Sequence, residues 1–298
     1  MMKKFFFMAG LVLLVAACSK ESENMVNNAQ VEKAVAPVKV HVTGFSVSQE
    51  DYNTTRAAQS VVDYEGVKVV TLAFYSGSTE VYKHEQTKGA LGAGETFGEF
   101  ECSLPMGSYT MVVIARGQGE NDGFTLTSPT VAAYTGDHSR ETFAYTQVVN
   151  VTNTSAVDIS ATLNRIVSKL EVRSSDGRTA NATKVRMTMS AGGKSFNPTT
   201  GLTTANTGFA NTVPISAAVG NTSSSTSYIF LANDEQNVNV TIETLDNDGA
   251  VLFSKTVDNV PFKRNRVTIL TGAMYTNDAV NGTFLLETAW LSNENVAF

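Results

Sequence analysis

The sequence predicts an all-β protein made of two β-sandwiches in tandem. Apolar and polar residues alternate at period two over many short segments, and turn-type dipeptides separate these segments. Beyond the N-terminus, no segment carries an apolar stripe at helical spacing. The chain has 298 residues, 42% of them apolar, which is enough to bury the cores of two domains of roughly 100–200 residues each.

The first 17 residues have the pattern of a secretory signal, with two lysines ahead of a short apolar run over 5–15. This run is shorter than the roughly 20 residues that a membrane-spanning helix needs. Residues 15–18 are similar to a lipobox, in which cleavage falls between Ala17 and Cys18 and the Cys18 thiol is then lipidated. The alternative is an ordinary secretory signal that happens to hold a cysteine. We expect a lipid on Cys18 that anchors the chain to a membrane.

Residues 18–36 are polar and aperiodic, which predicts a flexible tether. We divide the remainder into an N-terminal sandwich over 37–163 and a C-terminal sandwich over 164–298. The apolar residues just before this boundary occupy odd-numbered positions, and those just after it occupy even-numbered positions. Such a change of phase indicates a bulge or a strand that passes from one sheet to another. We expect Arg165 at this junction to keep its charged head in water.

The strands are expected where the alternation is clearest, at residues 38–47, 184–189, 238–243, 267–271 and 284–290. Residues 67–75 and 109–115 are apolar on both faces, which is typical of a central strand that is covered on both sides. Asp-Gly pairs supply the positive φ that tight hairpins need, and they lie at 122–123, 176–177 and 248–249.

Composition and motifs argue against catalysis and against nucleic-acid binding. The net charge is −6 without a basic run, whereas phosphate backbones attract clusters of Lys and Arg. His41, His84 and His138 lack the spacing of zinc ligands, and no nucleophile elbow is present. Lipidation of Cys18 leaves Cys102 as the one thiol, so no disulfide can form within the chain. We therefore expect no enzyme, no metal and no cofactor.

Five segments, in this order along the chain, resemble the fimbrillin family of Bacteroidetes surface lipoproteins, the subunits of type V pili. They are residues 38–45, 55–57, 104–110, 161–170 and 260–266. The branch that they resemble most is the one grouped with minor and anchor subunits. The resemblance implies two transthyretin-like sandwiches that assemble by strand exchange. A protease cuts after an arginine in an early loop, the first strand leaves, and a C-terminal strand of a neighbouring subunit fills the groove.

On this chain, the resemblance makes residues 37–47 the exchangeable strand and places the cleavage between Arg56 and Ala57. The anchors of the donated strand are Phe284, Leu286 and Trp290. Each assignment has a plainer alternative. The first strand is permanent in an anchor subunit, Arg56 is an ordinary loop residue, and the last strand stays within its own molecule.

We expect a fimbrial structural subunit with a role in cell adhesion, exposed at the cell outer membrane through the lipid on Cys18. Its partners are other fimbrial subunits, with host or bacterial surface receptors as further partners and no nucleic acid. Whether it is a shaft, tip or anchor subunit stays open. The alternative is a monomeric surface lipoprotein that binds glycans or host protein. The single tryptophan, Trp290, lies in a strand pattern rather than in a loop, which counts against this alternative.

Overall fold

The computed structural model describes residues 34–46, 60–118, 123–136, 138–276 and 284–289. Within these ranges the secondary structure consists of β-strands, without helices. In chain order, the strands are β1 (Val35–Ser46), β2 (Val69–Ser76), β3 (Thr79–Thr87), β4 (Glu99–Pro105), β5 (Gly107–Arg116), β6 (Phe124–Ser128), β7 (Val131–Tyr134), β8 (Thr142–Val151), β9 (Val157–Arg165), β10 (Ser168–Ser174), β11 (Lys184–Met189), β12 (Ser195–Phe196), β13 (Phe209–Pro214), β14 (Ser224–Ile229), β15 (Glu235–Leu245), β16 (Val251–Lys263), β17 (Val267–Gly272) and β18 (Leu285–Ala289). The prediction of an all-β fold is confirmed. The described part of the chain contains no helix that could span a membrane.

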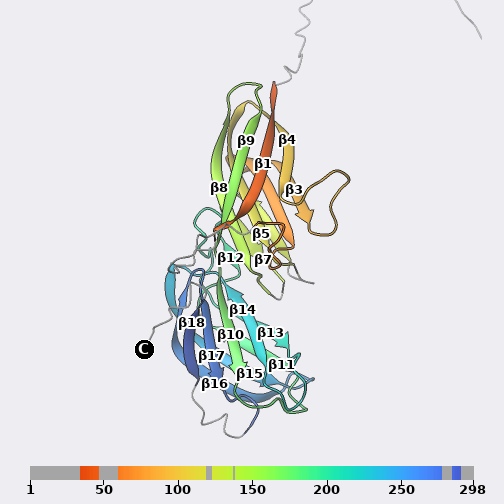
Figure 1. Cartoon of the computed structure of the whole chain (residues 1–298). Helices are drawn as coiled ribbons and strands as arrows, with labels where there is room; N and C mark the ends of the chain where they lie inside the picture. Colours follow the sequence, from red (N-terminus) through yellow and green to blue (C-terminus); the bar gives the residue numbers. More distant parts are fainter. Residues whose placement is uncertain (1–33, 47–59, 119–122, 137, 277–283, 290–298) are drawn as a thin grey trace, which may run out of the picture. The chain divides into compact units, whose positions relative to one another are not determined.

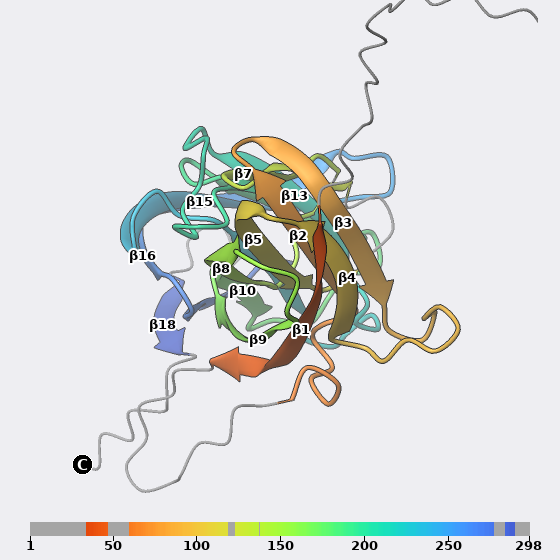
Figure 2. The ribbon, with the colours of Figure 1, turned by 90° about the horizontal axis from the view of Figure 1, so that it is seen from above.

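The first sandwich is one seven-stranded sheet with the strand order β3-β2-β5-β8-β9-β1-β4 (Figures 1 and 2). Strands β8 and β9 pair at two positions alone, Phe143 with Arg165 and Ala144 with Asn164. The sheet bends at this narrow seam into two layers, β3-β2-β5-β8 and β9-β1-β4. The core between the layers takes apolar side chains from both of them.

The second sandwich is made of two four-stranded sheets, ordered β14-β10-β17-β18 and β13-β11-β15-β16. Its core is a separate cluster whose buried members lie between Leu170 and Met274. A third cluster includes Tyr75 and Ile114 of the first sandwich and Phe230, which directly follows β14 of the second. It also includes Phe196 of β12, which forms a separate three-stranded sheet with β7 and β6. The rings of Phe196 and Phe230 stack with their centroids 4.3 Å apart.

The two sandwiches share one topology. In the first, β1 lies parallel to β9 and antiparallel to β4. In the second, β10 lies parallel to β17 and antiparallel to β14. The opposing layers, β3-β2-β5-β8 and β13-β11-β15-β16, also correspond strand by strand and are antiparallel throughout. The main difference is β18, which adds to β17 in the second sandwich.

Strand β2 confirms the prediction of a central strand that is covered on both sides. Leu72 and Phe74 point into the first core, whereas Ala73 and Tyr75 belong to the third cluster. All four side chains are fully buried. The change of phase near residue 165 is also explained, because β9 ends at Arg165 in the first sandwich and β10 begins three residues later in the second. The division of the folded part into domains at 163/164 stays a prediction.

The Asp-Gly pairs have different outcomes. The pair at 248–249 lies in the turn between β15 and β16, where Gly249 has a φ of 86° and the Asp246 carboxylate accepts the N–H of Ala250 at 2.8 Å. The prediction of a tight hairpin at 176–177 is wrong, because residues 175–183 connect β10 to β11, and these two strands lie in different sheets. Asp176 instead binds distant backbone, as described below. Asp122 lies outside the described residues.

Candidate strand-exchange site

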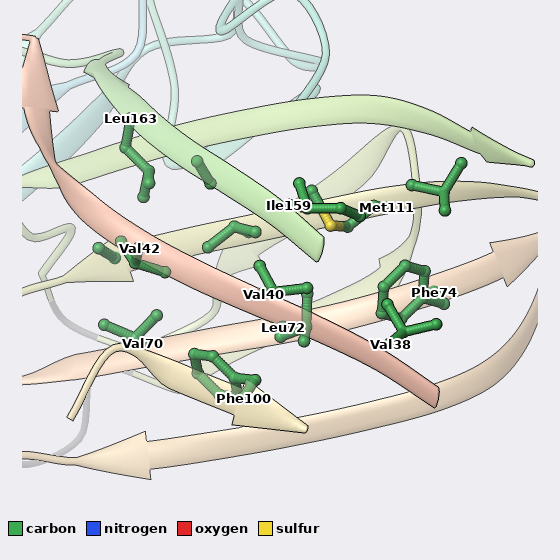
Figure 3. Close-up of a cluster of buried hydrophobic side chains, with 14 of the residues drawn as sticks. Val38, Val40, Val42, Val70, Leu72, Phe74, Phe100, Met111, Ile159 and Leu163 are labelled. Atoms are coloured by element: carbon green, nitrogen blue, oxygen red, sulfur yellow. The ribbon is translucent and has the colours of Figure 1, made fainter. Parts of the chain in front are cut away.

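Strand β1 lies in the middle of its layer, between β9 and β4 (Figure 3). Residues Val35 to His41 pair with β4, and residues Val38 to Ser46 pair with β9. The N–H of Val42 extends the contact with the β4 side by donating to Gly98 O at 2.8 Å. We name the space that β1 occupies between β9 and β4 the β1 slot. A chain that lost β1 would expose the backbone edges of both neighbouring strands along this slot.

The inward face of β1 is apolar along its whole length. Ala36, Val38, Val40, Val42 and Phe45 are at most 3% exposed. Figure 3 shows the three valines packed among side chains of the facing layer and of the neighbouring strands. These side chains include Leu72, Phe74, Phe100, Met111, Ile159 and Leu163. The β1 slot is therefore an apolar seam of aliphatic and aromatic side chains on the core side.

A bulge adjusts β1 to β9. Val42 pairs with Ala161 and Gly44 pairs with Thr162, so Thr43 is the extra residue. The Thr43 hydroxyl donates to Ala161 O at 3.3 Å. The bulge moves the inward position from Val42 to Phe45, three residues later, and thereby aims Phe45 into the core.

The outward face of β1 carries polar side chains that pair with β4. The ammonium of Lys39 lies 2.8 Å from the carboxylate of Glu101, and His41 contacts the carboxylate of Glu99. The hydrogen bond between Lys39 and Glu101 raises the pKa of Lys39 and lowers the pKa of Glu101. Because these groups are solvated, their contribution is small, and the apolar face holds β1 in place.

The C-terminal end of β1 rests on an aromatic cluster. The Phe45 ring lies 4.3 Å from that of Phe143 and 5.3 Å from that of Tyr64, centroid to centroid. The guanidinium carbon of Arg165 lies 4.7 Å from the Phe143 centroid. Phe45 and Arg165 thus share the Phe143 and Tyr64 rings, which connect the end of β1 to the junction between the sandwiches.

Arg165 is held by a buried network, contrary to the expectation of a solvated head. Its guanidinium donates to Glu141 Oε1 at 2.8 Å, to Asn265 Oδ1 at 2.8 Å and to the Tyr64 hydroxyl at 2.9 Å. Tyr64 in turn donates to Glu141 at 2.6 Å. The side chains of Arg165 and Glu141 are 4% and 9% exposed, so each buried charge is compensated by the other. Burial raises the pKa of Tyr64 to about 12.

Burial of β1 is worth a free energy comparable to the stability of a small domain. Val38, Val40, Val42 and Phe45 contribute about 1.5–3 kcal/mol each, or roughly 6–12 kcal/mol together, before the cost of ordering the strand. No cysteine lies in β1, so no disulfide holds it. Once its connection to the rest of the chain was cut, packing and backbone pairing alone would retain it.

Several predicted site residues lie outside the described part of the chain. These are Ala17 and Cys18 of the signal cleavage and lipidation site, Arg56 and Ala57 of the protease site, and Trp290 of the donated strand. Their roles stay predictions.

Phe284 and Leu286 are described, and they differ in burial. Phe284 is half-buried against the second core and packs over Gly272, where a Cβ would lie only 2.9 Å from its ring. Leu285 and Leu286 are 67% and 45% exposed. Strand β18, which pairs with β17 from Val267 to Thr271, thus leaves both leucines partly in water.

Asp176 holds the segment that leads towards β18. Its carboxylate accepts the backbone N–H groups of Met274, Tyr275 and Thr276 at 2.8–2.9 Å. The Tyr275 hydroxyl also contacts Ser223. Sequence patterns do not predict this clamp, because its partners are about a hundred residues apart and the Asp-Gly pair at 176–177 favours a turn.

His84, His138 and Cys102 lie in settings that are typical of structural side chains. His84 contacts Glu95 at 2.6 Å, and His138 donates to Thr212 O at 3.0 Å. Burial raises the pKa of the Cys102 thiol to about 11, which keeps it protonated and unreactive near neutral pH. Within the described ranges, no three His, Cys, Asp or Glu side chains come together as a metal site.

Fold and site together define an all-β protein of two topologically equivalent sandwiches, whose leading strand completes the first. Residues 32–287 match the model of a family of unknown function (DUF6562), and the chain belongs to this family. No curated protein matches the chain by sequence.

Among solved structures, the chain is similar to the fimbrial anchor protein Mfa2 from Porphyromonas gingivalis, with 12% identity over 85% of this chain and 97% of that one and a TM-score of 0.49. It is similar to the tip fimbrial protein Mfa3 from the same organism, with 11% identity over 86% and 99% and a TM-score of 0.40. A protein from Bacteroides ovatus that is described as a candidate adhesin has 11% identity over 89% and 96%, with a TM-score of 0.49.

Proposed function

We propose that this protein is a structural subunit of a fimbrium, assembled by exchange of β1 and acting in cell adhesion. Its class is then that of Mfa2 and Mfa3, which are named as fimbrial proteins. The observation that carries the proposal is the position of β1. It is the first described strand, it fills the middle of a layer with an apolar face, and it leads into the segment that contains Arg56.

Cleavage between Arg56 and Ala57 turns β1 into a separate peptide that is held by packing and backbone pairing alone. A strand of another subunit with apolar side chains at alternate positions can recover the same burial and the same backbone pairs with β9 and β4. Phe284, Leu286 and Trp290 have this alternation. Because donor and acceptor lie at different places on the molecule, such contacts do not close on themselves and propagate into a fibre.

In this proposal, the leader ends at Ala17 and the lipid on Cys18 fixes the protein at the outer face of the cell outer membrane. Two or more acyl chains give stable anchoring, since each buried methylene contributes about 0.8 kcal/mol. The chain carries no cofactor and performs no catalysis, since its role consists of packing and pairing. The apolar seam of the β1 slot and the exposed leucines of β18 support an assembly role.

The test is controlled cleavage of the purified chain with an arginine-specific protease. The matched control is Arg56→Lys, which keeps the charge and removes the cleavage site. We expect the wild-type chain to lose the β1 peptide and to form polymers that resist SDS, visible as a series of multiples of the subunit mass. The Arg56→Lys chain is expected to stay a monomer under the same conditions.

A wild-type chain that is cut at Arg56 and stays monomeric would contradict the proposal. A chain that stays monomeric and binds glycans or host protein on an array would favour the monomeric binding lipoprotein. Anchoring is tested separately with labelled palmitate, since Cys18→Ala should abolish incorporation. Continued labelling of Cys18→Ala would contradict the anchor.

A further inference from the structure

Each sandwich has two flanks, where the edge strands of its two layers meet. On one side these flanks are β3/β4 and β13/β14. On the other side they are β8/β9 in the first sandwich and, apart from the added strand β18, β16/β17 in the second. Open flanks expose backbone groups that pair readily with other chains, so proteins cover or block them. The four flanks of this molecule can therefore be compared directly.

Buried amide side chains close the first pair of flanks. Gln86 of β3 is 2% exposed, donates to Glu99 O of β4 and accepts from Gly98 N, both at 2.8 Å. At the equivalent place in the second sandwich, Asn211 of β13 is 1% exposed and donates to Ser227 of β14. Each amide joins the two layers of its sandwich.

The other two flanks differ from each other. Beside β17, strand β18 adds antiparallel and covers the edge. Beside β9, among the described residues, pairing with β8 stops at Asn164, and no strand pairs with the outer edge from Val157 to Leu163. Near the last paired residues, a cavity of about 620 Å³ opens, lined in part by Tyr145, Thr146 and Asn164.

The surface beneath this open flank is partly apolar and partly uncovered. Gln147 lies in the same phase of β8 as the buried Val149, yet it is exposed. Tyr145 and Val157 pack against the first core while remaining half-exposed. On the outward face of β9, Asp158 is the one charged residue before Arg165, so the edge lacks the row of charges that natural edge strands use against pairing.

We propose that the outer edge of β9 is a second docking edge, which takes the β18 strand of another copy of this chain in antiparallel orientation. The occupant follows from the internal repeat, since β9 and β17 hold equivalent positions and β18 is the strand that adds to β17. Strand β18 suits transfer because Leu285 and Leu286 are 67% and 45% exposed in its own sandwich. The inference rests on the proposed function for strand donation, but it needs neither cleavage nor loss of β1.

The experiment uses uncut full-length chains that carry Cys18→Ser and Cys102→Ser, so that introduced thiols are the sole ones. Chains with Ser160→Cys on β9 are mixed with chains with Leu285→Cys on β18 and oxidised, because Ser160 and Leu285 both lie on the solvent side of their strands. The matched control replaces Ser160→Cys with Ser254→Cys, an exposed serine on the edge strand β16. We expect about tenfold more disulfide-linked heterodimer from the Ser160→Cys mixture than from the Ser254→Cys mixture.

Equal yields from both mixtures would overturn the inference, and so would linkage that forms only after cleavage at Arg56. Circular dichroism and thermal unfolding of each variant establish that the exposed substitutions leave the fold intact. The two proposals fail independently of each other. Uncut chains can cross-link at β9 although cut chains never polymerise, and cut chains can polymerise through the β1 slot while the β9 edge stays empty.

Discussion

The leading strands of the two sandwiches, β1 and β10, hold the same place in the topology but differ in how the chain holds them. Both lie between a parallel and an antiparallel neighbour, and both bury alternate side chains. Strand β10 continues directly from β9 and leads by a described connection into β11. Strand β1 instead leads into the segment with Arg56. The same packing is thus permanent in one sandwich and, in our proposal, exchangeable in the other.

Arg165 lies where β9 of the first sandwich leads into β10 of the second, and its loss should have the largest effect. Arg165→Leu leaves Glu141 buried without its cation, which should lower the free energy of unfolding by about 3–5 kcal/mol. We also expect the unfolding transition to separate into two, one for each sandwich, in calorimetry. The control Arg186→Leu removes the partner of Glu243 in a more solvated pair and should cost about 1 kcal/mol or less. Equal losses in both variants would argue against the junction network.

A matched pair of valines compares the leading strands themselves. Val40 of β1 and Val172 of β10 are 0% and 1% exposed. Each change to alanine should destabilise the uncut chain by about 2 kcal/mol in denaturant unfolding. After cleavage and polymerisation, Val40→Ala should no longer change the free energy of unfolding because β1 has left. Val172→Ala should destabilise the polymer as it does the uncut chain. A Val40→Ala effect that persists in the polymer would mean that β1 stays in place.

Asp176 tests how firmly β18 is held. Asp176→Asn keeps the size of the side chain but weakens the acceptor of three backbone N–H groups, at an expected cost of about 1–2 kcal/mol. Hydrogen exchange should become faster in β18 and in residues 274–276, with little change in the first sandwich. Asp246→Asn is the control, because Asp246 accepts one N–H in an exposed turn. Faster exchange throughout the molecule would show that Asp176 supports the whole fold rather than β18.

The pKa of Tyr64 should depend on whether β1 is present. We expect this change to be the smallest of the predicted effects. Burial raises its pKa to about 12, against about 10 for free tyrosine. The unfolded chain therefore loses this proton first, so the stabilisation is complete below about pH 10 and is lost as the pH rises through about 12. When β1 leaves, Phe45 no longer covers Tyr64, and we expect its pKa to move towards 10. Ultraviolet titration with a Tyr64→Phe control assigns the change, and an unaltered curve after removal of β1 would contradict it.

The strands could be predicted from sequence because burial imposes a period of two on each of them. Val38, Val40 and Val42 show it directly, and β2 was identified as a covered central strand because it is apolar on both faces. Contacts between distant residues could not be predicted in this way. Arg165 looked like a solvated junction residue because its partners Glu141, Tyr64 and Asn265 are 24, 101 and 100 residues away.

The order of strands within each sheet could not be predicted either. Side-chain alternation shows which face of the sheet a residue lies on, but not which strands are neighbours. The position of β1 between β9 and β4, and the place of β18 beside β17, are properties of the topology alone. Asp176 shows the same limit. Its local pattern, Asp before Gly, favours a turn, whereas the carboxylate is used 98 residues further along the chain.

Native mass spectrometry of the cut chain tests the exchange of β1 most directly. A chain cleaved at Arg56 is mixed with an isotope-labelled copy, and the masses of the assemblies and of the released peptide are followed together. We expect one β1 peptide to be released for each acceptor slot that a neighbouring subunit fills. Assemblies that grow while every subunit keeps its β1 peptide would contradict this exchange.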